Sequence, residues 1–145
     1  MSLFSSIDVS ASGLSAQRQR AEILVENIAN AETTRTAEGG PYRRRDVVFE
    51  SSPASSQFSS AFASQLTEGA TGVRVSQIVT DNSEPNRRYL PGHPDADKDG
   101  YVSFPHENPA EDMVDLIGAQ RSYQANVSAI SAVKDMIQRS IDLFR

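Results

Sequence analysis

Apolar residues near the start of the chain recur at alternating steps of four and three. This spacing predicts a long amphipathic helix whose apolar stripe has the a/d pattern of a coiled coil. The stripe consists of Leu3, Ile7, Ser10, Leu14, Gln17, Ala21, Leu24, Ile28 and Ala31.

The end of the chain repeats this pattern. Its stripe consists of Leu116, Ala119, Tyr123, Asn126, Ile130, Val133, Ile137, Ser140 and Phe144, widened by Met113 and Ile117. Asn108 is suited to cap the helix, Pro109 favours the first helical position, and Glu111 occupies the acidic position of a capping box. We therefore expect a helix over residues 109–143, roughly 50 Å long at 1.5 Å per residue.

Both stripes are narrow and carry polar residues, which in coiled coils reduce stability but fix register and partner. One interpretation is that two ordinary amphipathic helices cover a compact domain. The interpretation we favour is that the helices pair with each other and with neighbouring copies, because the segment between them offers little core. The predicted subunit interface consists of Leu14, Ala21, Leu24, Ile28, Asn30, Met113, Leu116, Tyr123, Asn126, Ile130, Val133 and Ile137.

The middle of the chain changes to strand and loop patterns. Residues 44–50 and 72–80 predict short strands, and residues 101–104 are a candidate third strand. Residues 51–65 are rich in serine and predict a flexible loop or a segment that orders on contact. Pro85, Pro91, Pro94 and Pro105 exclude long helices there. We expect an α+β fold in which residues 1–33 and 108–145 form a helical coiled-coil domain and residues 34–107 a small domain of β-hairpin and loop.

Composition narrows the function. Leu, Ile, Val and Phe make up 32 of 145 residues, close to the one-fifth level below which chains tend to stay disordered. The net charge of −5 argues against nucleic-acid binding. No apolar run is long enough for a membrane span, and the first residues lack the features of a cleaved signal peptide. We therefore expect that helix order depends on partners.

An aspartate-rich stretch resembles the start of a calcium loop. Asp95, Asp97, Asp99 and Gly100 fit the loop pattern, but the closing glutamate position is taken by His106. A solvated turn is the interpretation we favour, because Asp-Gly is a strong turn signal. A weak calcium site is the alternative, in a small regulatory module whose helical hairpin binds partners.

Catalytic patterns are not found in the sequence. His93 and His106 are the only histidines and lie in a proline-rich loop. Glu111, Asp112 and Asp115 are explained by the positive end of a helix dipole. We expect no enzyme activity, no cofactor and no metal.

Three stretches resemble the flagellar basal-body rod proteins, most of all those of the proximal rod. They are residues 27–44, with Asn27-Ile28-Ala29-Asn30-Ala31 and Gly39-Gly40-Pro41-Tyr42; residues 91–102; and residues 111–126, with Glu111-Asp112-Met113-Val114-Asp115 and Tyr123-Gln124-Ala125-Asn126. The resemblance covers both ends and part of the middle.

The resemblance implies a structural subunit that polymerises into the drive shaft transmitting torque across the periplasm. Members of this family are exported through the flagellar type III apparatus without a cleaved signal. Their terminal helices form the inner layer of a helical hetero-oligomer. The implied partners are further copies, other rod proteins, and proteins of the basal-body ring and export gate.

Overall fold

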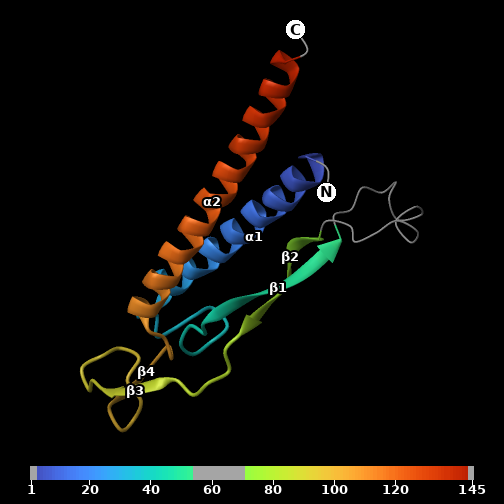
Figure 1. Cartoon of the computed structure of the whole chain (residues 1–145). Coiled ribbons are helices and arrows are strands. Elements are labelled where there is room, and N and C mark those ends of the chain that lie inside the picture. Colours follow the sequence, from blue (N-terminus) through green and yellow to red (C-terminus); the bar gives the residue numbers. More distant parts are fainter. Residues whose placement is uncertain (1–2, 54–70, 144–145) are drawn as a thin grey trace.

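The computed structural model describes residues 3–53 and 71–143. Two long helices, α1 (Leu3–Asn30) and α2 (Pro109–Asp142), run antiparallel, so both ends of the chain lie at the same end of the molecule (Figure 1). Short antiparallel strands connect them. The predicted α+β fold with paired terminal helices is confirmed.

The predicted cap and the predicted first residue of α2 are confirmed. Asn108 has an extended backbone, with φ −120° and ψ 95°, and its side chain accepts a hydrogen bond from the N–H of Ala110 at 3.2 Å. Pro109 takes the first helical position, where no N–H is needed. The helix therefore starts where the sequence predicts.

The longer β-hairpin lies along α1 (Figure 1). Strand β1 (Arg45–Pro53) pairs antiparallel with β2 (Thr71–Thr80). Val48 pairs with Gln77 and Phe49 with Val75, so Ser76 is the extra residue of a β-bulge. The two predicted strands are confirmed. Ser51 and Ser52 belong to β1, which corrects the predicted loop at its start, and residues 54–65 of that loop lie outside the described residues.

A second, shorter hairpin forms at the far end from the termini. Strand β3 (Asn86–Tyr89) pairs antiparallel with β4 (Tyr101–Phe104). The predicted strand at residues 101–104 is confirmed, whereas β3 was missed because Asn-Arg-Arg-Tyr carries little strand signal. Val102 is fully buried, and the guanidinium of Arg88 lies 4.7 Å from the centre of the Phe104 ring.

Burial is uneven along the helices. Ile23, Leu24 and Asn27 are buried near the end of α1, and Asp112 and Ala119 are buried near the start of α2. Toward the chain ends the helices separate (Figure 1). In that half the described buried residues are Ala16 and Val133. The molecule thus has a packed end, where the helices meet the strands, and an open end.

Gly100 closes the turn before β4 with a φ of +80°. A Cβ at this position would lie 2.9 Å from Cε2 of Tyr89. We expect Gly100→Ala to lower the free energy of unfolding by about 1–2 kcal/mol, because the variant combines a strained backbone with a clash. Urea unfolding of the full chain measures this change. Gly92→Ala is the control, since a Cβ there meets nothing within 4 Å. Equal losses in both variants would contradict the expectation.

Candidate assembly surfaces

Most of the predicted interface residues pack within the chain. Leu24 and Val133 are buried, with exposed fractions of 3% and 8%. Asn126 lies against α1 so closely that a Cβ on Gly13 would be 3.0 Å from its side-chain nitrogen. The half-buried members are Leu14, Ala21, Ile28, Asn30, Leu116, Ile130 and Ile137.

Met113 and Tyr123 differ from the other members of the predicted interface. Their exposed fractions are 52% and 41%. They therefore keep apolar surface that a neighbouring subunit could cover. For all twelve residues, contact with another subunit stays a prediction.

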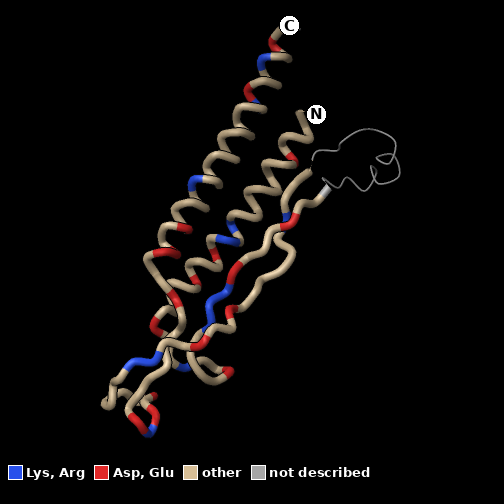
Figure 2. The backbone as a smooth tube through the Cα atoms, turned by 60° about the horizontal axis from the view of Figure 1, so that its bottom comes forward, with Lys and Arg blue, Asp and Glu red and all other residues tan. Residues whose placement is uncertain are grey.

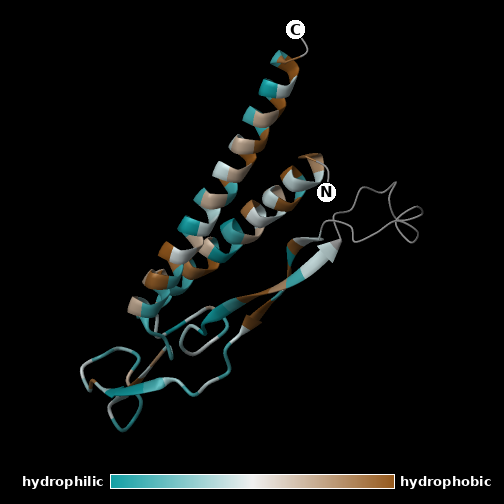
Figure 3. Ribbon diagram, viewed as in Figure 1, coloured by the Kyte–Doolittle hydropathy of each residue, from teal (hydrophilic) through white to brown (hydrophobic). Residues whose placement is uncertain are grey.

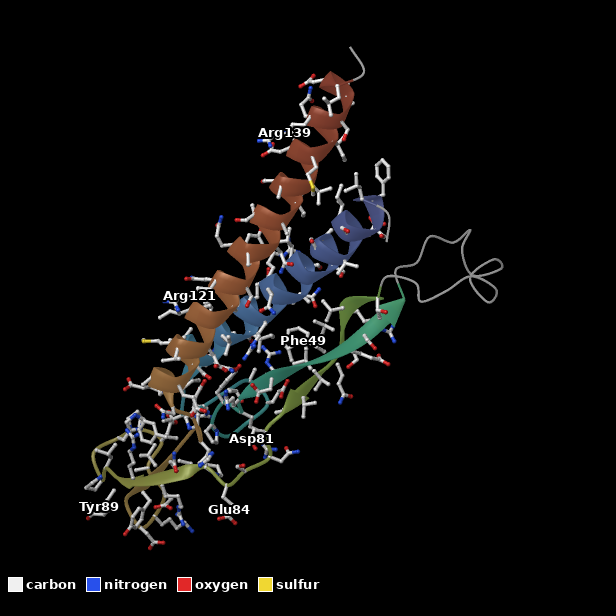
Figure 4. The ribbon with its side chains drawn as sticks, viewed as in Figure 1. Phe49, Asp81, Glu84, Tyr89, Arg121 and Arg139 are labelled. Atoms are coloured by element: carbon white, nitrogen blue, oxygen red, sulfur yellow. The ribbon has the colours of Figure 1, made fainter. Side chains whose placement is uncertain are left out.

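A second face of α1, outside the predicted apolar stripe, is covered by the longer hairpin. Ala16, Ile23 and Asn27 are buried on it, and Ser12 Oγ accepts a hydrogen bond from the N–H of Val73 at 3.1 Å. Ile23 adjoins a cavity of about 220 Å³ that Val47 and Phe49 also line, and Figure 4 shows Phe49 on the strand that faces α1. Ile23 is an apolar residue outside the a/d pattern, and this was the sequence signal that could have predicted a second buried face on α1.

Asn27 connects α1 to the start of β1. Its side-chain nitrogen donates to the carbonyl of Arg45 at 2.9 Å, and its side-chain oxygen accepts from the N–H of Arg45 at 3.1 Å. The hydroxyl of Tyr42 donates to the same oxygen at 2.9 Å. Asn27 is fully buried. It thus takes the place of a strand partner for the first residue of β1.

Ion pairs connect α2 to the rest of the molecule. Arg44 contacts the buried carboxylate of Asp112 at 2.8 Å, and Arg20 of α1 contacts Asp115 at 3.0 Å. Charges of both signs gather at this packed end (Figure 2). We call the cluster of Asn27, Tyr42, Arg44, Arg45, Glu107 and Asp112 the helix–strand joint.

The joint changes the acidity of its members. Burial, followed by the nearby carboxyl groups of Glu107 and Asp112, raises the pKa of Tyr42. The phenol therefore stays protonated and keeps donating its hydrogen bond to Asn27 over the physiological range. Two of the three acids that the helix dipole was expected to explain, Asp112 and Asp115, form specific ion pairs in this structure.

The outer side of α2 presents apolar and small residues to solvent. Val114, Ile117 and Met136 have exposed fractions of 68%, 49% and 49%, and hydrophobic residues recur along the helix toward its free end (Figure 3). Small exposed residues lie between them, so another helix could approach closely. We call this surface the α2 outer stripe, and it consists of Val114, Ile117, Gly118, Ala125, Ala129, Ala132 and Met136.

The open end of the molecule also exposes large apolar side chains. Phe4 at the start of α1 is 72% exposed, and Leu143 just past α2 is 85% exposed. Exposed large apolar side chains of this kind are typical of surfaces that bind other proteins.

The aspartate-rich stretch forms a turn. Asp97 Oδ1 accepts hydrogen bonds from the N–H groups of Asp99 and Tyr101, at 2.9 and 2.8 Å. The pKa of Asp97 is lowered, chiefly by the bond from Tyr101. Asp95 accepts from the hydroxyl of Thr34 at 2.8 Å. These oxygens bind the chain itself, so the geometry supports the turn and gives no support to the calcium site.

The two histidines lie beside different carboxylates. His93 is 3.9 Å from Asp95, and His106 is 3.9 Å from Asp81. Within residues 3–53 and 71–143, no group of three or more His, Cys, Asp or Glu side chains is arranged to hold a metal ion.

In the part of the chain that the structure describes, neither α1 nor α2 has the length and hydropathy needed to cross a membrane.

Comparison with known proteins identifies the family of this chain. Residues 7–35 match the family described as "Flagella basal body rod protein", and residues 99–143 match "Flagellar basal body rod FlgEFG protein C-terminal". The flagellar basal-body rod protein FlgC of Bacillus subtilis is 42% identical over 99% of both chains. FlgC of Borreliella burgdorferi is 40% identical over 100% of this chain and 99% of its own, and FlgC of Salmonella typhimurium is 33% identical over 99% and 98%. The chain therefore belongs to the FlgC family of flagellar basal-body rod proteins.

Proposed function

We propose that this chain polymerises, with further copies and other rod proteins, into the shaft that transmits torque across the periplasm. As a FlgC family member it is a structural subunit of the flagellar rod and not an enzyme. The observation that carries the proposal is the uncovered apolar surface of α2 and of the open end, which a single chain leaves in water. Burying it between subunits is favourable by about 25 cal/mol per Å² of apolar surface.

The proposed assembly uses the terminal helices as one part of the molecule and the middle as another. Residues 1–33 and 108–145 would form the helical layer, and residues 34–107 the β and loop part. The α2 outer stripe would meet the helices of neighbouring subunits, while the residues of the two predicted apolar a/d stripes keep α1 and α2 paired. Proteins of the basal-body ring and the export gate are proposed as further partners at the ends of the rod.

Assembly would also complete the helices. The open end buries little apolar surface, so it offers little to offset the roughly 1–2 kcal/mol of backbone entropy lost per ordered residue. The packed end, with Leu24, Asn27 and Ala119 buried, would stay folded in the free chain. Order at the open end would then come from neighbours.

We expect dilute free chain to show less helix than the 28 residues of α1 and 34 of α2 together, and assembled rods to show all of it. Far-UV circular dichroism per residue measures both samples. Rods composed of this chain and its rod partners provide the assembled state. A free chain with full helix content at low concentration would contradict assembly-dependent ordering, while leaving membership of the rod family unchanged.

A further inference from the structure

Two acidic side chains of the helix–strand joint have buried oxygens without a hydrogen-bond partner. Asp112 is 1% exposed and gives Oδ1 to Arg44 at 2.8 Å. Its Oδ2 and both carboxyl oxygens of Glu107 are shielded from solvent, and among the described residues none of the three has a hydrogen-bond partner. Buried carboxylate oxygens without partners are costly, so their presence here requires an explanation.

The charges around Glu107 do not balance. Arg44 is shared between Asp112 and Asp46, whose carboxylate lies 3.5 Å from the guanidinium. With Glu107 ionised, three carboxylates would compete for this cation. The titratable and charged groups facing the cluster come from three segments and are Tyr42, Arg44, Asp46, Asp81, His106, Glu111 and Asp112. From α1 the neutral amide of Asn27 meets Tyr42.

We propose that Glu107 and Asp112 share one proton beneath Arg44, and that losing this proton to water as the pH rises loosens the joint between α2 and β1. While the proton is present, one carboxyl donates to the other and Arg44 neutralises the remaining charge. After it leaves, two buried carboxylates face each other at the first turn of α2.

The acidity of Glu107 agrees with this arrangement. Its pKa is raised to about 7, first by burial and then by the neighbouring carboxyl group of Asp112, with Arg44 acting in the opposite direction. The unfolded chain binds this proton only below about pH 4.5. Between these two values the folded chain holds a proton that the unfolded chain lacks. The stability from this group is therefore full below pH 4.5 and is lost as the pH rises through about 7.

Glu107 and Asp112 lie at the start of α2, where they can affect how this helix is held. Glu107 immediately precedes Asn108, the residue that caps α2, and Asp112 belongs to the first turns of the same helix. A weakened joint would therefore change how α2 is held against α1 and β1. The shared proton would act within one chain, whichever rod neighbours that chain meets.

The test is a carboxyl ¹³C NMR titration of the full chain. We expect Glu107 to titrate near pH 7, a shift of more than two pH units from an unfolded glutamate, and to titrate at lower pH in Asp112→Asn. Because the joint is in the packed end, it is observable in the free chain. A Glu107 midpoint below about pH 5.5, or one unchanged by Asp112→Asn, would overturn the proposal.

Unfolding supplies the second measurement. The urea midpoint of the parent chain is expected to fall between pH 5 and pH 8, and Glu107→Gln to remove most of that fall by keeping a neutral side chain. Glu111→Gln removes the same charge within the same turn and should leave the fall in place. If Glu107→Gln retains the whole pH dependence of the parent, no proton is shared at this site.

Discussion

Asn27→Ala is expected to lower the free energy of unfolding by about 2–4 kcal/mol, the largest effect on stability that we predict for a single side chain. The amide of Asn27 satisfies both the N–H and the carbonyl of Arg45 and also accepts from Tyr42. Alanine would leave these three groups unpaired in a fully buried place. Urea unfolding at pH 6, followed by circular dichroism, measures the loss.

Asn30→Ala is the matched control, with the same substitution in the same helix. Its side-chain nitrogen donates to the carbonyl of Glu26 in the preceding turn, and its oxygen accepts from the hydroxyl of Thr33. Asn30 is partly exposed, so water can replace these bonds and we expect a loss of about 1 kcal/mol or less. Similar losses in the two variants would show that Asn27 does not connect α1 to β1 as the contacts indicate.

Val114→Asp is expected to abolish rod assembly and motility while leaving the free chain folded as before. Val114 is 68% exposed in the single chain, so the change removes little packing there. An acid in the early part of a helix is also tolerated by the helix dipole. In a dry contact between subunits, an unpaired carboxylate costs several kcal/mol. Swimming of cells carrying the variant and recovery of their basal bodies measure the effect.

The control for this variant places the same charge elsewhere on α2. Gln120→Asp is on the same helix, is exposed, and lies outside the α2 outer stripe. We expect cells carrying it to assemble rods. If Val114→Asp cells swim normally with the protein present at its usual level, the outer stripe does not contact a neighbour. Loss of helix in the free variant would instead assign Val114 a role within the chain.

The paired terminal helices were predictable because their signals are local. The steps of three and four place apolar residues on one side of a helix, and Asn108 and Pro109 mark the start of α2 by chemistry that acts within a few residues. The turn at Gly100 follows from the same kind of signal, since Asp-Gly favours a positive φ whatever surrounds it. Three strands were also predicted from local patterns, such as the alternation along residues 72–80.

The joint could not be predicted, because its partners are far apart in sequence. The pairing of Arg44 with Asp112 spans 68 residues, and Asn27 binds Arg45 across 18. The local sequence around Asn27 does not show whether its amide lies on the helix surface or is buried and binds the backbone of β1. The same applies to Glu107, whose altered acidity depends on burial and on a carboxylate from another segment.

The sequence by itself determined the two long helices, their narrow apolar stripes and the family to which the chain belongs, because periodicity and short signatures are properties of neighbouring residues. Only the tertiary structure decided which stripe residues are covered within the chain and which remain exposed. It alone placed a second face of α1 against the hairpin and brought one arginine between several carboxylates. The physical reason is that burial and electrostatic interactions depend on distance in space.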